Sequence, residues 1–277
     1  MSSEKLNEQS YLLSSQYKSA NNLKARIALH ENYGTGKIDF HKWLFEHIDI
    51  KDNAVILELG TGSARVWVQN RDRIPQDWSI TLSDFSKGML AEAKKNLVNV
   101  KHDFSFKQID IQDIPFSDNS FDMVMANHML YHVPDIDKAI KEVKRVLKSK
   151  GKFYASTNGE GNMLETKQML AKVAQILPPE LVVNSFSSSF TLESAPDYLS
   201  KCFKTVKRFD LNSEIIVDKV EPIMAYLMSM TAVDKLEELM PIVEQEKAMK
   251  QLIEFIEDKL TSGPIKIRTK TGLLVAF

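Results

Sequence analysis

Residues 54–59, with the sequence AVILEL, form an almost continuous apolar run that leads into Gly60. A run of this kind is typical of a parallel strand that is buried on both faces of a sheet. Similar short runs follow it, separated by stretches whose apolar residues recur at helical spacing. The further strands predicted in this part of the chain cover residues 78–84, 104–109, 121–127 and 151–157. This alternation predicts an α/β fold, in which helices cover both faces of a parallel sheet.

The alternation is less regular outside this region. Residues 1–50 have apolar positions at helical spacing and predict two or three short helices, broken around residues 32–36. Gly151 is expected to end a helix over residues 136–147 and to open the strand that follows. Beyond residue 157 we expect helices over 163–177, 192–203 and 220–260, a loop over 185–190, and strands over 205–211, 214–217 and 265–277.

These patterns divide the chain into three predicted parts. The first, over residues 1–50, is an N-terminal helical lid, and the second, over residues 51–157, is a ligand-binding core. The third, over residues 158–277, contains the remainder of the sheet, with helical cap insertions at about 158–190 and 219–262. The core carries the chemically informative motifs.

The charges of the 277-residue chain nearly cancel, with 36 Lys and Arg against 37 Asp and Glu and a formal net charge of -1. A chain without an overall basic field matches a nucleic-acid backbone poorly, so we expect no nucleic-acid partner. The first ten residues are polar, and no run of about 18 apolar residues occurs, so neither a secretion leader nor a membrane span is expected. The single cysteine excludes an intrachain disulfide. A cytoplasmic protein is the expectation.

A glycine turn and a distant acid define a candidate ligand site. Gly60 and Gly62 follow the first strand, and Asp84 ends the second strand, 24 residues after Gly60. Ligands of open α/β sheets bind at the carboxyl ends of the strands, and glycines allow close approach to the backbone. An acid about 20 residues after the turn is suited to accept hydrogen bonds from ribose hydroxyls. The spacing therefore predicts a nucleoside-containing ligand.

The residues around the turn indicate which nucleoside. A dinucleotide site requires a third glycine that packs the helix under a pyrophosphate, and Arg65 stands at that position. Glu58, beside the turn, would repel a pyrophosphate but suits a ligand with an ammonium and a sulfonium group. Charge therefore favours S-adenosylmethionine, whereas a nicotinamide-dependent oxidoreductase stays open as the less favoured alternative.

Four segments in this order resemble the class I S-adenosylmethionine-dependent methyltransferases, in particular the small-molecule branch that includes the ubiquinone and menaquinone biosynthesis enzymes. These segments are AVILELGTG, TLSDFSKGML, KQIDIQDIPFSDNSFDMVMANHMLYHVPD and RVLKSKGKFYAST, and the resemblance covers residues 54–157. It implies a Rossmann-like sheet of seven mostly parallel strands, with an antiparallel last strand and helical cap elements. The turn departs from the usual family residues, which are Asp, Cys and Gly, at Glu58, Thr61 and Arg65.

The resemblance also implies roles for individual residues. The turn Gly60, Thr61 and Gly62 would pass beneath the methionine part of the cofactor, and Glu58 would reach its ammonium directly or through water. Asp84 would hold the ribose hydroxyls. The residues that would border the adenine are Phe85 and Met89.

Further residues follow the third and fourth strands. Asp110 would accept a hydrogen bond from the adenine amino group, the Ile111 amide would donate to the ring, and Gln112 lies nearby. Asn127 would face the methionine end through its backbone. In related enzymes the N-terminal helices fold over the cofactor, so the residues of this segment expected to line the pocket are Tyr33 and His30.

The reaction implied by the resemblance is in-line transfer of a methyl group to an oxygen, nitrogen or carbon atom of a small molecule. The candidate bases, where the acceptor has to lose a proton, are His128, His132 and His30. No N/D-P-P-Y/F signature follows the fourth strand, which argues against methylation of amino groups on nucleic-acid bases. His128 and His132 are four residues apart, but without an HExxH pattern we expect no metal site. A non-catalytic protein that binds an adenosyl ligand is the second alternative.

Overall fold

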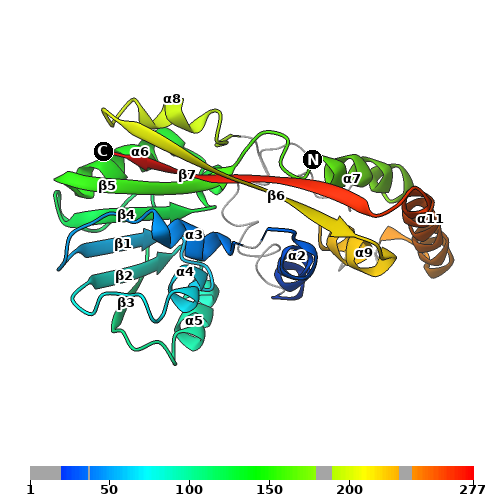
Figure 1. Ribbon diagram of the computed structural model, residues 1–277, viewed down its shortest axis with the longest axis horizontal. Helices are drawn as coiled ribbons and strands as arrows, with labels where there is room; N and C mark the ends of the chain where they lie inside the picture. Colours follow the sequence, from blue (N-terminus) through cyan, green and yellow to red (C-terminus); the bar gives the residue numbers. More distant parts are fainter. Residues whose placement is uncertain (1–19, 37, 179–188, 231–238) are drawn as a thin grey trace. The chain divides into compact units, whose positions relative to one another are not determined.

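The computed structural model describes residues 20–36, 38–178, 189–230 and 239–277 (Figure 1). Its strands form one seven-stranded sheet in the order β3-β2-β1-β4-β5-β7-β6. The strands are β1 (Val55–Leu59), β2 (Ser79–Asp84), β3 (Phe104–Gln108), β4 (Phe121–Asn127), β5 (Leu147–Asn158), β6 (Val206–Val217) and β7 (Ile265–Ala276).

The first five strands are parallel, because β1 pairs in parallel with β2 and β4, β2 with β3, and β4 with β5. The last strand reverses this direction, since β7 pairs with β5 antiparallel. Reciprocal backbone hydrogen bonds of 3.0 Å join Thr205 and Phe277 at the β6 side of β7. The predicted Rossmann-like sheet with an antiparallel last strand is confirmed.

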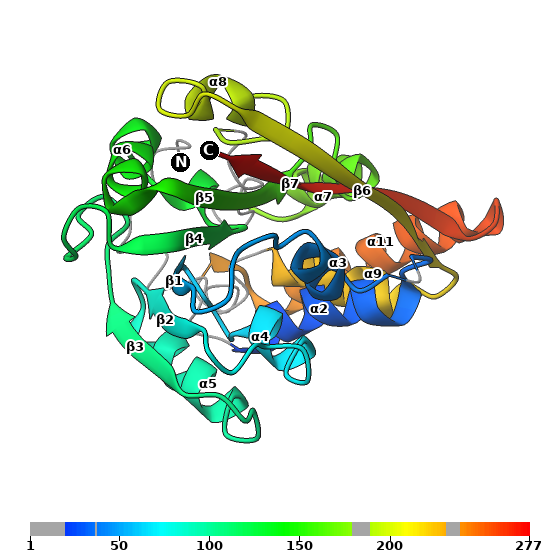
Figure 2. The same ribbon diagram turned by 60° about the vertical axis from the view of Figure 1, so that its left-hand side comes forward.

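Helices connect these strands or pack around them (Figures 1 and 2). The described helices of four or more residues are α2 (Ala20–Tyr33), α3 (Phe40–Glu46), α4 (Arg65–Gln69), α5 (Lys87–Asn96), α6 (Ile136–Val146), α7 (Leu164–Ile176), α8 (Ala195–Leu199), α9 (Val220–Ser229) and α11 (Ile242–Thr261). A short 3-10 helix, η3 (Leu130–His132), follows β4.

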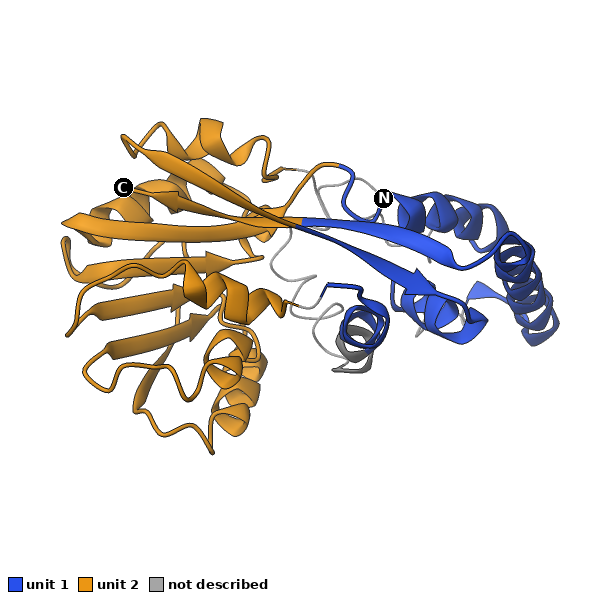
Figure 3. Ribbon diagram, viewed as in Figure 1, with its two compact units in different colours: residues 1–37, 161–186, 212–270 blue, residues 38–160, 187–211, 271–277 orange. Residues whose placement is uncertain are grey.

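The chain divides into two compact units (Figure 3). The sheet unit comprises residues 38–160, 187–211 and 271–277, and the helical unit comprises residues 1–37, 161–186 and 212–270. Strands β6 and β7 each run from one unit into the other. This division differs from the predicted parts with boundaries at residues 50 and 157, because α3 belongs to the sheet unit and the C-terminal strand returns to it.

Two apolar cores flank the sheet of the sheet unit. Successive residues of a strand face opposite sides, so Ile56 packs with the helices α3, α4 and α5, whereas Leu57 packs with α6 and α8. Both side chains are fully buried. The covered faces explain why β1 has almost no polar residue, and they leave the carboxyl ends of the strands as the place for a polar site. The helical unit has a separate core, built from α2, α7, α9 and α11.

Gly151 lies inside β5 and does not end a helix, so this prediction is wrong. Helix α6 ends at Val146, and β5 begins at once with Leu147. The pairing of β4 with β5 shifts between Phe121 and Met123. A Cβ atom at Gly151 would lie 3.0 Å from the carbonyl oxygen of Phe121, so the glycine is needed for close approach of backbone at this irregularity.

Other boundaries also differ from the predictions. The two strands predicted over 205–211 and 214–217 are one strand, β6, because it lies at the edge of the sheet and tolerates the polar residues between them. The helix predicted over 192–203 is regular only in α8. The helix predicted over 220–260 appears as α9 and α11, while residues 231–238 and most of the predicted loop at 185–190 lie outside the described residues.

The first residues of β4 are anchored by a carboxylate. Asp122 accepts hydrogen bonds from Lys148 Nζ at 2.7 Å and from the backbone of Val55 at 3.0 Å, and it forms an ion pair with Lys51. Burial raises the pKa of Asp122, but these partners outweigh it and lower the pKa to about 2. Ionised Asp122 therefore stabilises the strand at neutral pH.

We expect Asp122→Asn to lower the free energy of unfolding by about 2 kcal/mol at pH 7, because a depressed pKa measures a stabilised ionised form. This contribution is present above pH 4, the ordinary range of an aspartate, and is lost as the pH falls toward 2. Denaturant unfolding at both pH values checks it. Asp118→Asn, which removes an exposed ion pair with Arg145, is the control and should cost less than about 1 kcal/mol. Equal losses of unfolding free energy in the two variants would contradict the stabilising role of ionised Asp122.

Candidate functional site

The turn after β1 is shaped by residues in the left-handed backbone region. Gly60 has φ of 71° and Gly62 has φ of 55°. A Cβ atom at Gly60 would lie 2.9 Å from Met129 Cγ, so only glycine fits between the turn and the end of β4. A Cβ atom at Gly62 would meet nothing closer than 4.0 Å. Gly60 is therefore needed for packing, and Gly62 leaves open space above the turn.

Three hydrogen bonds tie this turn to the end of β2. Thr61 N donates to the carbonyl of Ser83 at 2.8 Å, and the Ser83 hydroxyl donates to the carbonyl of Glu58 at 2.7 Å. Gly62 N donates to Asp84 Oδ2 at 3.0 Å. The glycine turn and the acid that the sequence places 24 residues apart thus meet directly at the carboxyl edge of the sheet.

Asp84 is held in a fixed orientation at this edge. Its Oδ1 accepts a hydrogen bond from Ser86 N at 2.8 Å, while its Oδ2 accepts from Gly62 N. Burial raises the pKa of Asp84, and these backbone donors oppose the rise. Each carboxylate oxygen keeps capacity for a further hydrogen bond, since an ionised carboxyl group has about four acceptor positions.

Glu58 is buried beneath the turn, with 2% of its surface exposed. Its Oε2 accepts hydrogen bonds from Thr61 Oγ1 at 2.8 Å and from Trp67 Nε1 at 2.6 Å. Its Oε1 accepts from Asn127 Nδ2 at 3.0 Å. Burial raises the pKa of Glu58, against the effect of these three donors. The carboxylate joins the turn, helix α4 and the end of β4 at one point.

Asn127 continues this network across the sheet. Its Oδ1 accepts a hydrogen bond from Ser156 Oγ at 3.2 Å, so the side chain is fixed between β1 and β5. His128 follows with φ of 51°, and its N–H donates to the carbonyl of Ser156. The strained conformation turns the chain sharply at the end of β4.

The imidazole of His128 has two defined neighbours. Its Nε2 lies 3.2 Å from Thr271 Oγ1 on β7, and its ring contacts Phe40 edge-on at a centroid distance of 5.0 Å. His132 lies in η3, with its ring against that of Tyr131 at a centroid distance of 4.5 Å. Of these two histidines, His128 directly follows the residue that contacts Glu58.

The loop after β3 borders the same edge. Asp84 and Gln108 are paired in register, and Ile109 N donates to the carbonyl of Asp84. The Asp110 carboxylate accepts hydrogen bonds from both the backbone and the side chain of Gln112. Ile111 is buried. The loop is therefore held by its own side chains, next to the end of β2.

Phe85 and Met89 follow Asp84 in the chain. Phe85 is half-buried, and its carbonyl accepts a hydrogen bond from Gln108 Nε2 at 2.8 Å. Met89 lies in the first turn of α5, where its N–H donates to the capping residue Ser86. Its Cε is the atom nearest to the open position above Gly62. The adjacent elements thus bring these two residues to the turn.

Comparison with known proteins agrees with this geometry. Residues 57–155 match the family model of a methyltransferase domain. A segment of 107 residues is 39% identical to the ubiquinone/menaquinone biosynthesis C-methyltransferase of Rickettsia felis and 38% identical to that of Rickettsia massiliae. Each match covers 36% of this chain and 43% of the relative, so the chain spans less than half the length of these relatives. Residues 57–155 are therefore similar to a methyltransferase domain, and this segment is called the methyltransferase-like domain below.

Solved structures support the fold of this methyltransferase-like domain and its surroundings. A phosphoethanolamine N-methyltransferase 2 of Haemonchus contortus, in complex with S-adenosyl-L-methionine, aligns with a TM-score of 0.59 at 18% identity, over 97% of this chain and 59% of that one. The YcgJ protein of Bacillus subtilis aligns with a TM-score of 0.55 at 17% identity, over 85% of this chain and 96% of that one.

Two predicted site residues lie outside the methyltransferase-like domain, in the helical unit. His30 and Tyr33 are in the last turn of α2. Tyr33 packs against the core of the helical unit, and the carbonyl of His30 accepts a hydrogen bond from Gly34 N. Their assignment to the cofactor pocket stays a prediction.

Several residues of the methyltransferase site have no signal in the sequence. Trp67 contacts Glu58 from nine residues away, Ser156 contacts Asn127 from β5, and Thr271 reaches His128 from the C-terminal strand. No motif spacing connects these pairs, because they meet only through the order of the strands. A tryptophan shortly after the turn is the single hint, since a buried indole needs an acceptor for its N–H.

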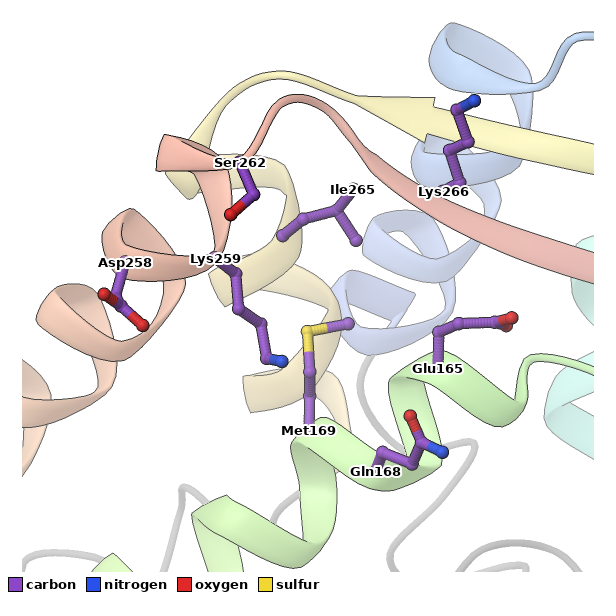
Figure 4. Close-up of a pocket in the computed structure, with 8 residues that line it drawn as sticks. All are labelled: Glu165, Gln168, Met169, Asp258, Lys259, Ser262, Ile265 and Lys266. Atoms are coloured by element: carbon purple, nitrogen blue, oxygen red, sulfur yellow. The ribbon is translucent and has the colours of Figure 1, made fainter.

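The helical unit carries a separate depression of about 410 Å³, lined by α7, the end of α11 and the start of β7 (Figure 4). Its lining is mostly polar, including Lys259, Glu165 and Gln168. None of the residues described at the methyltransferase site lines it.

Within the described ranges, no group of three His, Cys, Asp or Glu side chains is placed to hold a metal ion. None of the helices described is long and apolar enough to cross a bilayer.

Proposed function

We propose that this chain is an S-adenosylmethionine-dependent methyltransferase that acts on a small-molecule acceptor. The observation that carries the proposal is the contact between Asp84 and the amide of Gly62, which joins the acid and the glycine turn into one site. This contact lies in a domain that matches the methyltransferase family. The acid is placed to bind a ribose, and the turn gives the ligand access to the backbone.

The residues present fit this cofactor in charge and in space. The carboxylates of Glu58 and Asp84 suit a ligand that carries ammonium, sulfonium and hydroxyl groups, and they disfavour a pyrophosphate. The backbone of Gly62 carries no side chain and has no atom closer than 4.0 Å to its Cβ position, so a ligand can approach it closely. Glu58 keeps one acceptor position on Oε1, because Oε2 accepts two hydrogen bonds and Oε1 accepts one. We assign this position to the ammonium group.

The comparisons support an acceptor that is a small molecule. The Rickettsia relatives are named as ubiquinone and menaquinone C-methyltransferases, and the Haemonchus protein is named as a phosphoethanolamine N-methyltransferase. The first group suggests a carbon acceptor and the second a nitrogen acceptor. Since the sequence match to the first group is the stronger, we favour a carbon or oxygen nucleophile of a partly apolar ring.

The residues of the chain perform three tasks in this reaction. When bound, the cofactor supplies a methyl group that is already activated by the sulfonium, so alignment of the acceptor provides much of the rate. Asp84 and the Gly60–Gly62 turn hold the ligand, and Glu58 orients its methionine end. We assign to His128, at the end of β4, the task of taking a proton from the acceptor.

The contacts of Thr271 favour one tautomer of His128. Thr271 Oγ1 lies 3.2 Å from His128 Nε2 and 3.2 Å from the carbonyl oxygen of Thr157. A carbonyl only accepts, so the hydroxyl donates to Thr157 and accepts from Nε2–H. The neutral imidazole then has its lone pair on Nδ1. This arrangement satisfies both contacts of the hydroxyl, whereas the other tautomer leaves two oxygen acceptors facing each other.

Calorimetry with S-adenosylhomocysteine and with NADH tests the proposal. We expect micromolar binding of the first ligand, at roughly 8 kcal/mol, and none of the second. Release of S-adenosylhomocysteine from S-adenosylmethionine in the presence of hydroquinones, phenols and small amines then tests turnover. Binding of NADH alone would overturn the proposal in favour of an oxidoreductase. Adenosyl binding without turnover of any acceptor would favour a non-catalytic binding protein.

A further inference from the structure

The site described so far leaves one group of the cofactor without a partner. S-adenosylmethionine carries a carboxylate beside its ammonium group, and the residues assigned to the methionine end are Glu58, the turn Gly60–Gly62 and Asn127. None of them carries a positive charge. Two like charges at about 4 Å disfavour each other strongly in a site shielded from water, so a carboxylate next to Glu58 needs a hydrogen-bond donor of its own.

His41 is the side chain with a ring N–H donor that the structure brings to this region. It lies in the first turn of α3, and its carbonyl accepts a hydrogen bond from Asn70 Nδ2 at 3.0 Å. The same Asn70 nitrogen donates to the carbonyl of Val66 in α4, at 2.7 Å. This buried asparagine therefore joins the first turn of α3 to α4, the helix that follows the glycine turn.

The neighbours of His41 place it at the methionine end of the site. The ring of Phe40 contacts the rings of both His41 and His128, with centroid distances of 5.4 Å and 5.0 Å. His128 in turn follows Asn127, the partner of Glu58. The charge of His41 also acts on Glu58, whose pKa it lowers against the effect of burial. His41 therefore lies on the side of the site where Glu58 is found.

A carboxylate lies next to the imidazole of His41. Asp39 Oδ1 lies 3.5 Å from His41 Nδ1, an ion-pair distance, and accepts hydrogen bonds from the backbone of His41 and Lys42. The contact with the His41 side chain is the main reason why the pKa of Asp39 falls to about 2. Asp39 faces Nδ1 at this distance, and the two ring nitrogens point in divergent directions, so Nε2 is the nitrogen that we assign to the ligand.

We propose that the imidazole of His41, which lies beside Asp39, donates a hydrogen bond to the carboxylate of the cofactor, while Glu58 binds the ammonium group. The two charged groups of the ligand then each have a partner, His41 on α3 and Glu58 on β1. This inference rests on the proposed function, because it names a partner for the same cofactor. It assigns a binding task to a segment that precedes the first strand.

The test compares two ligands that differ only in the carboxylate: S-adenosylhomocysteine and its decarboxylated analogue, S-adenosyl-3-thiopropylamine. We expect His41→Gln to weaken the binding of S-adenosylhomocysteine about tenfold, as for the loss of one charge-assisted hydrogen bond. The affinity for the analogue should not change. The parent should prefer S-adenosylhomocysteine, and the variant should not distinguish the two ligands. Lys42→Gln removes an exposed charge from the same helical turn and is the matched control, with both affinities unchanged.

The outcomes separate this inference from the proposed function. If neither ligand binds the parent protein, the proposed function fails, and the inference fails with it. If both ligands bind the parent but His41→Gln weakens them equally, His41 supports the fold of the site, and only the inference is overturned. Unchanged affinity of the variant for S-adenosylhomocysteine overturns it as well. Thermal unfolding of each variant establishes that the protein is folded in every titration.

Discussion

Replacement of Asp84 by alanine is expected to weaken S-adenosylhomocysteine binding by at least about 100-fold. Two ribose hydroxyls would lose a charged acceptor, and a hydrogen bond to a charged group contributes roughly 1.5 to 3 kcal/mol. The variant also removes the acceptor of Gly62 N and Ser86 N, so the turn itself loses its connection to β2. Isothermal titration calorimetry measures the loss directly.

Two further variants define what this loss means. Asp84→Asn keeps one acceptor oxygen and should fall between the parent and the alanine variant. Asp52→Ala removes an exposed acid from the turn before β1, at the opposite edge of the sheet, and should bind like the parent. An affinity of Asp84→Ala within about twofold of the parent would remove Asp84 from the ribose site, whatever the fate of the other residues.

Replacement of Glu58 by glutamine is expected to change stability and binding in opposite directions. Burial raises the pKa of Glu58, so the folded protein without ligand disfavours the ionised form. The neutral amide removes this cost, and the free energy of unfolding at pH 7.5 should rise. Binding of S-adenosylhomocysteine should weaken by about tenfold, because the ammonium group loses its charged partner.

The hydrogen-bond network can accept this substitution. A glutamine oxygen can serve Thr61 and Trp67, while its amide nitrogen can donate to Asn127 once that side chain turns over. The Ser156 hydroxyl can accept from the turned amide, since a hydroxyl both donates and accepts. Glu58→Ala is the contrasting variant, because it leaves three buried donors without an acceptor and should destabilise the fold by about 3 kcal/mol or more.

The pH dependence of binding gives an independent check on Glu58. A cofactor that binds the ionised carboxylate releases a proton from a group with a raised pKa, so the affinity of the parent should fall as the pH is lowered toward the acid range. Asp84, whose pKa burial also raises, contributes in the same direction. Glu58→Gln should remove part of this dependence. If the affinity of Glu58→Gln has the same pH profile as that of the parent, the assignment of Glu58 to the ammonium group is contradicted.

The boundaries that the sequence did not predict share a physical cause. Gly151 had the pattern of a helix end, but its missing side chain serves the close approach of β5 to Phe121. The polar residues inside β6 had the pattern of a break, but an edge strand accepts them on its exposed side. In both cases, packing against a distant strand overrode a local preference.

The amino-acid pattern alone determined the alternation of strands and helices, the glycine turn and the acid at the end of the second strand. These features depend on apolar periodicity and on turn chemistry, which act between residues close together in the chain. Only the tertiary structure decided that Trp67 and Asn127 meet on Glu58, that Thr271 fixes the ring of His128, and that α3 brings His41 to the turn. Such contacts depend on the order of the strands and on helix docking, and residues up to 143 positions apart meet only after the sheet has formed.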